Sequence, residues 1–358
     1  MRIKKALFLG TLCTAVSGMS LFAQAGVSYA KSAEKTTEAA SSEEAESEEE
    51  TSEEVTYPIT IEHAFGETVI ESKPERIATI GWENQDTPLE LGVAPVGVSA
   101  ANYGMVTDNN LHPWTDEAFA DLGVEKPVVF DDVDGLDFEQ ISDCNPDVIL
   151  AAYSGMTQED YDTLSQIAPV IPYKEKAWQT SWREQTIENA EGMGMKPEGE
   201  KKVKEVEDLI AEKLEEYPQL EGIPTAFCWI SADDFSTFYV YLPTDPRAAY
   251  LLDLGLTLPE SVQKLAGETD DFNITVSREN ADQLDDIQLM VVYGDEDLLK
   301  SLQEDKLMSQ IPAIKNGAVA LVDSTSALAG ASTPSILSIP YEIDEYLQLL
   351  SDAAENIK

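Results

Sequence analysis

The chain has 358 residues, which suits two domains of ordinary size once terminal extensions are set aside. Its 68 acidic and 23 basic residues give a formal net charge of -45, which argues against a nucleic-acid partner because phosphate binding needs a basic surface. The acidity is explained by solubility, and a hydrophobic content of 43% is enough for buried cores.

The N-terminus has the pattern of an export signal. Three of the first five residues are basic, and residues 6–22 form an apolar stretch. Two small-x-small cleavage patterns follow, at residues 23–25 and 28–30. We therefore predict a signal peptide over residues 1–30 and a location on the outer face of the cytoplasmic membrane. No other stretch of the sequence is long and apolar enough to span a bilayer.

The mode of membrane retention is left open by the next features. Cys13 is a candidate for lipid attachment, but the preceding Gly10-Thr11-Leu12 fits that motif poorly. Residues 31–56 consist largely of Glu, Ser, Thr and Ala, and their charges repel one another. We predict a disordered acidic linker here, either a leash for an anchored protein or a spacer in a secreted one.

Residues 57–180 are predicted to form an N-terminal α/β lobe. Short apolar runs alternate with helical patterns, which is typical of a parallel sheet covered on both faces by helices. The predicted strands are residues 57–61, 67–70, 77–80, 95–98, 128–130, 146–151 and 170–171. One helix is predicted to end at Gly92, and two others are predicted over residues 138–141 and 158–166. Residues 100–121 are expected to be irregular.

The carboxyl ends of these strands are where a ligand is expected, since open α/β sheets bind ligands there. Trp82 follows the predicted strand 77–80, and Tyr153 and Ser154 follow the strand 146–151. Tyr103 lies in the irregular stretch. These side chains are therefore expected near a pocket.

Residues 181–217 are predicted to be a helical connection between two lobes. The pattern breaks at residues 192–197, which contain two glycines and a proline. Apolar residues then recur every three or four positions, at Val203, Val206, Leu209, Ile210, Leu214 and Tyr217. At about 1.5 Å per residue the later part is roughly 30 Å long, so it would act as a stiff rod.

Residues 218–358 are predicted to form a C-terminal α/β lobe. The predicted strands are residues 225–230, 238–241, 287–293 and 318–322. Helices are predicted from the loop before Arg247 to Leu254, over 298–308 and over 339–357. Residues 275–284 are expected to hold a turn and a short helix, and residues 324–333 to form a loop.

The two lobes repeat one order of elements: a helix, a glycine, a short acidic helix and a buried strand. Residues 89–93 parallel residues 252–256 in this order. Glu139 and its following strand likewise parallel Glu279 and the strand after it. The pattern indicates a diverged internal duplication.

Cysteine and histidine are scarce. After the signal only Cys144 and Cys228 remain, one in each lobe, and they are expected to be buried free thiols. The two histidines, His63 and His112, are far apart in sequence, which disfavours a zinc or manganese carrier.

Several short segments, in this order along the chain, resemble one family. They are Pro74-Glu75-Arg76-Ile77, residues 91–98, Asn145-Pro146-Asp147-Val148-Ile149-Leu150-Ala151, residues 167–172 and Trp182-Arg183. With the signal, the acidic linker and two lobes around a helix, the chain resembles the substrate-binding proteins of bacterial iron-siderophore ABC transporters. The resemblance covers residue 57 to the C-terminus, and the poor motif at Cys13 departs from it.

The resemblance implies a fold and a carrier function. The fold is α/β, with two Rossmann-like lobes of mainly parallel sheet joined by a long interdomain helix. The protein would be a monomer that captures a ferric siderophore between its lobes and delivers it to an ABC permease dimer. Glu139 and Glu279 match the glutamates that the family presents to permease arginines, and two carboxylates at fixed spacing can engage two basic pockets.

A ferric siderophore brings its own oxygen ligands to the iron, so no cofactor and no metal ligand are expected from the protein. The site would instead need aromatic walls and a cation. The candidates are Trp82, Tyr103, Tyr153, Trp178, Trp182, Tyr241 and Arg247, with Arg183 as a second choice of cation. The few arginines favour a near-neutral hydroxamate over a highly charged catecholate.

The sequence fits two other functions to different degrees. A haem or cobalamin carrier of the same architecture stays open, because Tyr153, Tyr241 or Met156 could ligate haem iron. An enzyme is not expected, since the sequence lacks a phosphate-binding glycine loop, a Gly-x-Ser-x-Gly elbow and a His-Glu-x-x-His motif.

Overall fold

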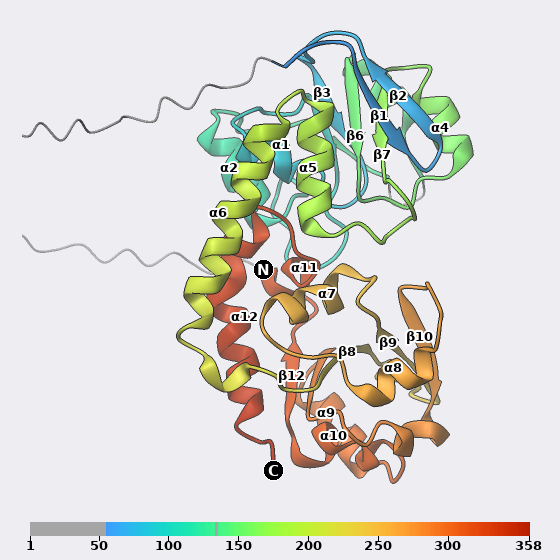
Figure 1. Cartoon of the computed structure of the whole chain (residues 1–358), viewed down its shortest axis with the longest axis vertical. Coiled ribbons are helices and arrows are strands. Elements are labelled where there is room, and N and C mark those ends of the chain that lie inside the picture. Colours follow the sequence, from blue (N-terminus) through green and yellow to red (C-terminus); the bar gives the residue numbers. More distant parts are fainter. Residues whose placement is uncertain (1–54, 133–134) are drawn as a thin grey trace, which may run out of the picture. The chain divides into compact units, whose positions relative to one another are not determined.

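Two five-stranded sheets form the framework of the computed structural model, which describes residues 55–132 and 135–358 (Figure 1). All of these residues belong to one compact unit. The predicted signal peptide, Cys13 and nearly all of the predicted linker lie outside the described residues. Among the described helices, none combines the length and the apolar composition that a membrane crossing requires.

The first lobe contains a parallel sheet in the order β5-β4-β3-β6-β7. Its strands are β3 (Ile77–Thr79), β4 (Gly97–Ser99), β5 (Val129–Phe130), β6 (Val148–Ala151) and β7 (Val170–Pro172). Nearly every residue in them is buried, as expected for strands covered on both faces. The helices of this lobe are α1 (Asp86–Glu90), α2 (Pro113–Asp121), α3 (Phe138–Asp143) and α4 (Gln158–Leu164). An antiparallel hairpin, β1 (Ile59–His63) with β2 (Gly66–Ile70), precedes the sheet.

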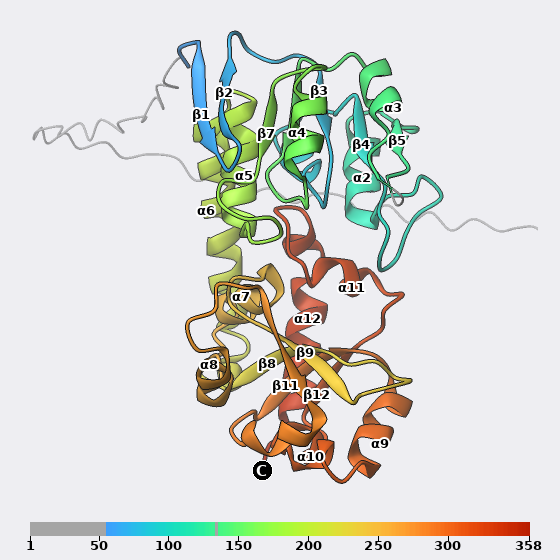
Figure 2. The same cartoon turned by 90° about the vertical axis from the view of Figure 1, so that its right-hand side faces the viewer.

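The second lobe contains a mixed sheet in the order β10-β9-β8-β11-β12 (Figure 2). Its strands are β8 (Thr225–Trp229), β9 (Thr237–Tyr241), β10 (Asn273–Ser277), β11 (Leu289–Tyr293) and β12 (Val319–Val322). Its helices are α7 (Pro246–Asp253), α8 (Glu260–Ala266), α9 (Glu296–Glu304), α10 (Pro312–Asn316), α11 (Ala327–Ala331) and α12 (Ser338–Ala354), with 3-10 turns η1 (Pro218–Leu220), η2 (Arg278–Gln283) and η3 (Met308–Gln310).

Both lobes have the same strand order. If the strands of each lobe are numbered in chain order, the first strand lies at the centre of the sheet, between the second and the fourth. Gly92 and Gly255 end the first helix of their lobes with φ of 78° and 79°, a left-handed conformation that glycine adopts without strain. The lobes differ at β9, which runs antiparallel to β8 and to β10. The α/β fold predicted from the sequence, with mainly parallel sheets, is confirmed.

Two helices connect the lobes. α5 (Trp182–Gly192) starts with a capping box between Ser181 and Glu184, and α6 (Lys196–Leu214) follows after a short break. α6 packs against α5 in the first lobe and α12 in the second, and Figure 1 shows it running along both. Val203, Val206 and Ile210 are its buried apolar face, as the sequence pattern predicted.

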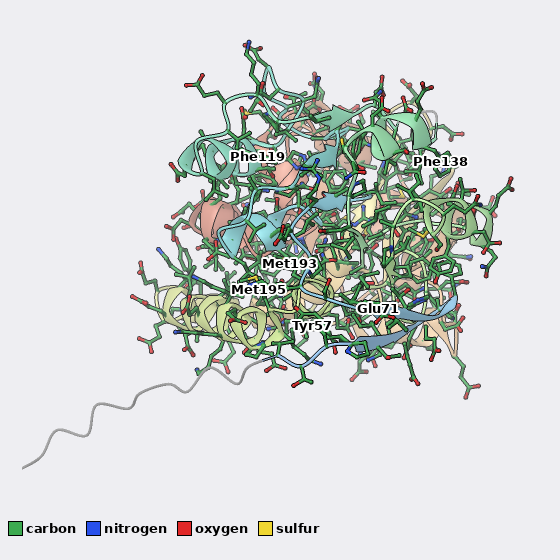
Figure 3. The ribbon with its side chains drawn as sticks, turned by 90° about the horizontal axis from the view of Figure 1, so that it is seen from above. Tyr57, Glu71, Phe119, Phe138, Met193 and Met195 are labelled. Carbon is green, nitrogen blue, oxygen red and sulfur yellow. The ribbon has the colours of Figure 1, made fainter. Side chains whose placement is uncertain are left out.

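The break between α5 and α6 is shorter than predicted, because α6 already begins at Lys196. Pro197 is tolerated there, since the first helical turn needs no backbone donor. The ring of Tyr57 packs at this break, beside Met193 and Met195 (Figure 3). A Cβ at Gly194, whose φ is 67°, would lie 2.0 Å from the Tyr57 hydroxyl. Glycine is therefore required for both the turn and the contact.

Several short elements differ from the sequence predictions, among them α2, α11, β10 and α8. Residues 100–121 were expected to be irregular, but Pro113 starts α2 from its first position. Residues 324–333 were expected to be a loop, but they contain α11, whose cap is the Ser326 side chain accepting from the Ala329 amide. The strand β10 and the helix α8 were also missed. All four are short elements whose stability comes from tertiary packing and not from local propensity.

Candidate functional site: an aromatic cavity between the lobes

A cavity of about 400 Å³ lies between the two lobes. Four of its lining residues come from the first lobe and six from the second, and eight of the ten are aromatic. They are Trp82, Tyr103, Tyr153, Trp178, Trp229, Tyr241, Arg247, Phe272, Tyr293 and Thr333. Its size and its mainly aromatic walls are those of a small-molecule site.

The strand order explains the position of this cavity. In an open α/β sheet, ligands bind at the carboxyl ends of the strands where the order reverses, which is between the first and fourth strands of each lobe. Trp82 and Tyr153 follow β3 and β6, the first and fourth strands of the first lobe. Trp229 and Tyr293 are the last residues of β8 and β11, their counterparts in the second lobe. The cavity is thus formed where the switch points of two sheets face each other.

Six of the seven ligand-site candidates from the sequence line this cavity. Trp182 does not, because its side chain is only 2% exposed and belongs to the core of the connecting helices. Its indole Nε1 donates to the Asp253 carboxylate at 3.0 Å. Arg183 lies over the Trp182 ring and pairs with Asp253 and Glu207, so it does not reach the cavity. Ser154 lines a second cavity next to the first.

The first-lobe wall is held by a network of buried amides. Asn84 is fully buried, and its Nδ2 donates to the carbonyl oxygens of Ile80 at 2.7 Å and Tyr153 at 2.9 Å. Its Oδ1 accepts from the Tyr153 amide at 3.1 Å and from Asn189 of α5 at 3.0 Å. Gln185 of α5 donates to the Trp82 carbonyl at 2.8 Å. The backbone of both aromatic residues is therefore fixed to the connecting helix without any charged group.

Backbone conformation marks the same wall. Four described residues other than glycine have positive φ, and two of them are asparagines, which tolerate it. The other two are Glu83 at 56° and Trp178 at 62°. Trp178 lines the cavity, and Glu83 adjoins Trp82. Such strain costs on the order of 1–3 kcal/mol per residue and tends to be kept at functional sites.

The second-lobe wall is organised around an ion pair. The Arg247 guanidinium lies 3.9 Å above the centre of the Tyr241 ring. Its Nε and Nη2 donate to the two oxygens of Asp245, at 2.8 and 2.7 Å. Asp245 is 1% exposed and also caps α7. The pair is bidentate and leaves the wall close to neutral, although the remaining N–H groups of Arg247 keep their donor character.

The tyrosines of the cavity act as neutral hydrogen-bonding groups. Burial raises the pKa of Tyr241 to about 12 and raises the pKa of Tyr103 and Tyr153 further. The Tyr293 hydroxyl donates to the Ser332 hydroxyl at 2.7 Å, because the Ser332 proton is donated to the Ala329 carbonyl. The phenols of Tyr103, Tyr153 and Tyr241 are neutral at neutral pH and can therefore donate to the oxygens of a ligand.

Contacts between the lobes flank the cavity on two sides. On one side, the rings of Tyr103 and Tyr293 meet edge to face, with centres 5.2 Å apart. Next to them the Met105 amide donates to the Ser326 carbonyl at 2.9 Å. On the other side, Lys176 pairs with Asp270, and Gln179 donates to the carbonyl oxygen of the same residue at 3.0 Å.

A buried cluster of titratable groups lies behind the first-lobe wall. His112 Nδ1 is 3.1 Å from Glu83 Oε1, and His112 Nε2 is 2.9 Å from the Tyr103 carbonyl. Asp86 accepts from Trp114 at 2.9 Å, from Thr115 at 2.8 Å and from Ser335 of the second lobe at 2.5 Å. Of these contacts, the hydrogen bond from Ser335 to Asp86 is the one that joins the two lobes.

The protonation of this cluster is set by burial. Burial raises the pKa of Glu83 well above its ordinary value and lowers that of His112. Burial, followed by the charge of Glu83, raises the pKa of Asp86 to about 7. At least one carboxyl of the cluster is therefore protonated in mildly acidic solution.

The predicted docking glutamates occupy equivalent positions. Glu139 is the second residue of α3, after the Asp137 cap, and Glu279 is the second residue of η2, after the Ser277 cap. Both side chains are exposed. The structure thus places one exposed carboxylate at the start of a short helical turn in each lobe.

Trp229, Phe272, Tyr293 and Thr333 line the cavity but were not singled out from the sequence. A signal for two of them was present, because Trp229 and Tyr293 end the strands that match those before Trp82 and Tyr153. The internal repeat would have identified them. Phe272 and Thr333 lie in connections whose course depends on the tertiary fold, and the sequence carries no local signal for them.

Comparison with known proteins gives consistent results. A sequence profile described as "Periplasmic binding protein" matches residues 77–325. The crystal structure of PiaA from Streptococcus pneumoniae TIGR4 in complex with ferrichrome is 48% identical, with a TM-score of 0.81, and the match covers 84% of this chain and all of that one. The petrobactin-binding protein YclQ of Bacillus subtilis is 24% identical over 305 residues, 81% of this chain and 88% of that protein. Staphylococcus aureus SirA, complexed with staphyloferrin B, shares the fold at 23% identity, with a TM-score of 0.64 over 84% of this chain and 99% of that one. The chain therefore belongs to the periplasmic binding protein family.

Proposed function

We propose that this protein is the extracytoplasmic solute-binding component of an ABC importer and that its cargo is a ferric siderophore held between the two lobes. The observation that carries the proposal is the cavity of about 400 Å³, with eight aromatic side chains and one arginine among its ten lining residues. The relation to PiaA, solved with ferrichrome, supports it.

The iron would be carried within the siderophore, with no resident cofactor. Within the described ranges, no group of three or more His, Cys, Asp or Glu side chains is arranged to hold a metal ion. The neutral phenol of Tyr241 and the guanidinium of Arg247 suit the oxygens of a chelate that already surrounds its metal.

A near-neutral ferric hydroxamate is the favoured ligand class. The charge of Arg247 is balanced by Asp245, and no second cation lines the cavity in the part of the chain that the structure describes. A ligand with several negative charges would lose its hydration in this cavity, and the walls have no matching set of positive charges to offset that cost. Haem and cobalamin remain outcomes that the binding test distinguishes, and the relatives named above do not favour them.

Delivery requires a partner in the membrane. We propose that the protein acts as a monomer and that Glu139 and Glu279 contact basic pockets on an ABC permease dimer. Their exposure and their equivalent positions on the two lobes support this role. We also propose that the protein is retained at the outer face of the membrane, by a lipid at Cys13 or by other means. We further propose that it has no enzymatic activity.

Tryptophan fluorescence tests the proposal directly, because Trp82, Trp178 and Trp229 line the cavity. The protein is titrated with ferrichrome, with a ferric tris-catecholate and with haemin. We expect saturable quenching by ferrichrome, weaker binding of the catecholate and no Soret shift with haemin. Saturable haemin binding with a Soret shift, in the absence of any response to the ferric chelates, would replace the siderophore by haem.

A further inference from the structure

A second cavity, of about 290 Å³, adjoins the first. Trp82 and Trp178 line both cavities, so they form the partition between them. All lining residues of the second cavity come from the first lobe. We call it the side chamber. The side chamber therefore lies within the first lobe, whereas the main cavity lies between the two lobes.

The side chamber is rich in hydrogen-bond acceptors. Asp132 and Asp160 line it, together with the hydroxyl groups of Ser99 and Ser154. Both hydroxyl protons are already used: Ser99 donates to Asp132, and Ser154 donates to the Ala151 carbonyl at 2.9 Å. The oxygens that remain can only accept. Among the described residues that line the side chamber, none is lysine, arginine or histidine.

The two cavities therefore differ in the groups that pair with their carboxylates. In the main cavity Asp245 has a bidentate arginine. In the side chamber the partly buried Asp132 has only the neutral Ser99 hydroxyl as its hydrogen-bonded side-chain partner among the described residues. Burial raises the pKa of Asp132, which reflects the cost of holding its charge there. A cation supplied by a ligand would remove that cost.

We propose that the side chamber is a subsite for a positively charged, hydrogen-bond-donating arm, such as a primary ammonium group, on the ferric hydroxamate that occupies the main cavity. The proposal rests on the proposed function, because the ferric centre must lie in the main cavity for an arm to pass between Trp82 and Trp178. It names a specificity within that ligand class: chelates with an amine-bearing arm bind more tightly than the same chelates without the charge.

A matched pair of ligands tests the proposal. Ferrioxamine B carries a free ammonium group at the end of a flexible arm, and its N-acetyl derivative keeps the ferric centre and the arm but loses the charge. Fluorescence titration gives the dissociation constant of each for the unmodified protein. We expect the ammonium form to bind tighter by a factor on the order of five to ten, and this factor should shrink as salt is added.

Asp132→Asn identifies the group responsible. Asparagine still accepts from Ser99 but carries no charge, so the ratio of the two dissociation constants should fall to about one, while ferrichrome affinity stays unchanged. The control is Asp121→Asn, which removes an exposed charge that does not line the side chamber and should keep the ratio. Because each ratio is measured within one variant, a small loss of stability does not affect it.

Two results would overturn the proposal: equal affinities for the two chelates in the unmodified protein, or a preference that survives in Asp132→Asn, since that would show discrimination by the size of the acetyl group. Neither result touches the proposed function. Failure of that function would appear differently, as no saturable binding of either chelate or of ferrichrome.

Discussion

The two walls of the main cavity are built by opposite means. The first-lobe wall is held by buried amides, with Asn84 and Gln185 joining the Trp82 and Tyr153 backbone to α5. The second-lobe wall is held by the Arg247–Asp245 pair stacked on Tyr241. Amide hydrogen bonds are insensitive to salt and pH, whereas a charged pair responds to the charge of whatever binds beside it. We infer that the first-lobe wall fixes the shape of the cavity and that the second-lobe wall determines which ligand charge the cavity accepts.

The sheets behind these walls show a related difference. Both have the same strand order, but a hairpin links β8 to β9, whereas a segment containing α1 joins β3 to β4. The reversed strand β9 lies beside β8, on the side opposite β11, and the central first and fourth strands are parallel in both lobes. The connection to the second strand can thus change while the ligand-facing end of the central pair is maintained.

The largest effect is expected at the cluster behind the first wall, from Asp86→Asn. With a pKa of about 7, folded Asp86 keeps a proton that the unfolded chain releases near pH 4. This group therefore stabilises the folded state at low pH and loses that contribution as pH rises from about 4 to 7, by up to roughly 4 kcal/mol. Asparagine does not titrate, so the variant should lack this slope.

Urea unfolding at several pH values between 4 and 8 measures the effect as the difference between unmodified protein and variant. Glu83 and His112 face Asp86 and interact with its charge, so the difference between the two curves reports the loss of the Asp86 proton together with its effect on these neighbours. The exposed Asp121→Asn serves as control and should leave the slope as it is. Parallel curves for Asp86→Asn would mean that Asp86 is ionised throughout this range.

The next effect is expected from Asn84→Ala, which removes the centre of the amide network. The Tyr153 amide and the Asn189 side chain would lose buried partners, at a cost of roughly 2–4 kcal/mol in the free energy of unfolding. Ligand affinity should fall as well, because the backbone of Trp82 and Tyr153 is no longer fixed. Chemical denaturation and fluorescence titration measure the two losses. The exposed Asn280→Ala is the matched control, and an equal response of both variants would contradict the role assigned to Asn84.

A smaller effect is expected from Asp245→Asn in the second wall. Asparagine can still cap α7, but Arg247 loses its counter-charge, which should cost about 2 kcal/mol of stability. The same change should shift ligand preference from neutral toward anionic ferric chelates. Affinities for ferrichrome and for a ferric catecholate, compared between variant and unmodified protein, reveal the shift. An unchanged ratio would show that Arg247 does not sense ligand charge.

The smallest effect on the isolated protein is expected from Glu139→Ala combined with Glu279→Ala. Both side chains are exposed, so melting temperature and ligand affinity should stay within experimental error. Transport into cells or proteoliposomes containing the permease should be lost, since the docking contacts are gone. Impaired ligand binding in the double variant would place these residues in the cavity wall instead.

The sequence predicted the fold well where signals were long or repeated. The buried strands around Ile149 and Val291 and the apolar face of α6 follow from periodicity alone. Short elements such as α11 were missed because a run of small residues is equally compatible with a loop. Periodicity fixes which face of an element is buried, but it does not fix its length when tertiary packing decides it.

The cavity was predicted mainly through the strand ends. Trp82 and Tyr153 follow central strands, and so they could be placed without a structure. Trp182 was grouped with them as a candidate aromatic wall, but its indole donates to Asp253 in the core. Which aromatic ring faces a ligand and which one packs inside depends on side-chain direction, and sequence spacing does not encode that direction for an isolated residue.

At Gly104 and Gly330 the main chains of the two lobes come into direct contact. A Cβ at Gly104 would lie 2.8 Å from the Gly330 amide nitrogen and 3.1 Å from the Ser326 carbonyl oxygen, so the two main chains touch here directly. Contact made by backbone atoms does not change when neighbouring side chains are exchanged. A substitution at an aromatic residue of the cavity should therefore leave this backbone contact between the two lobes in place.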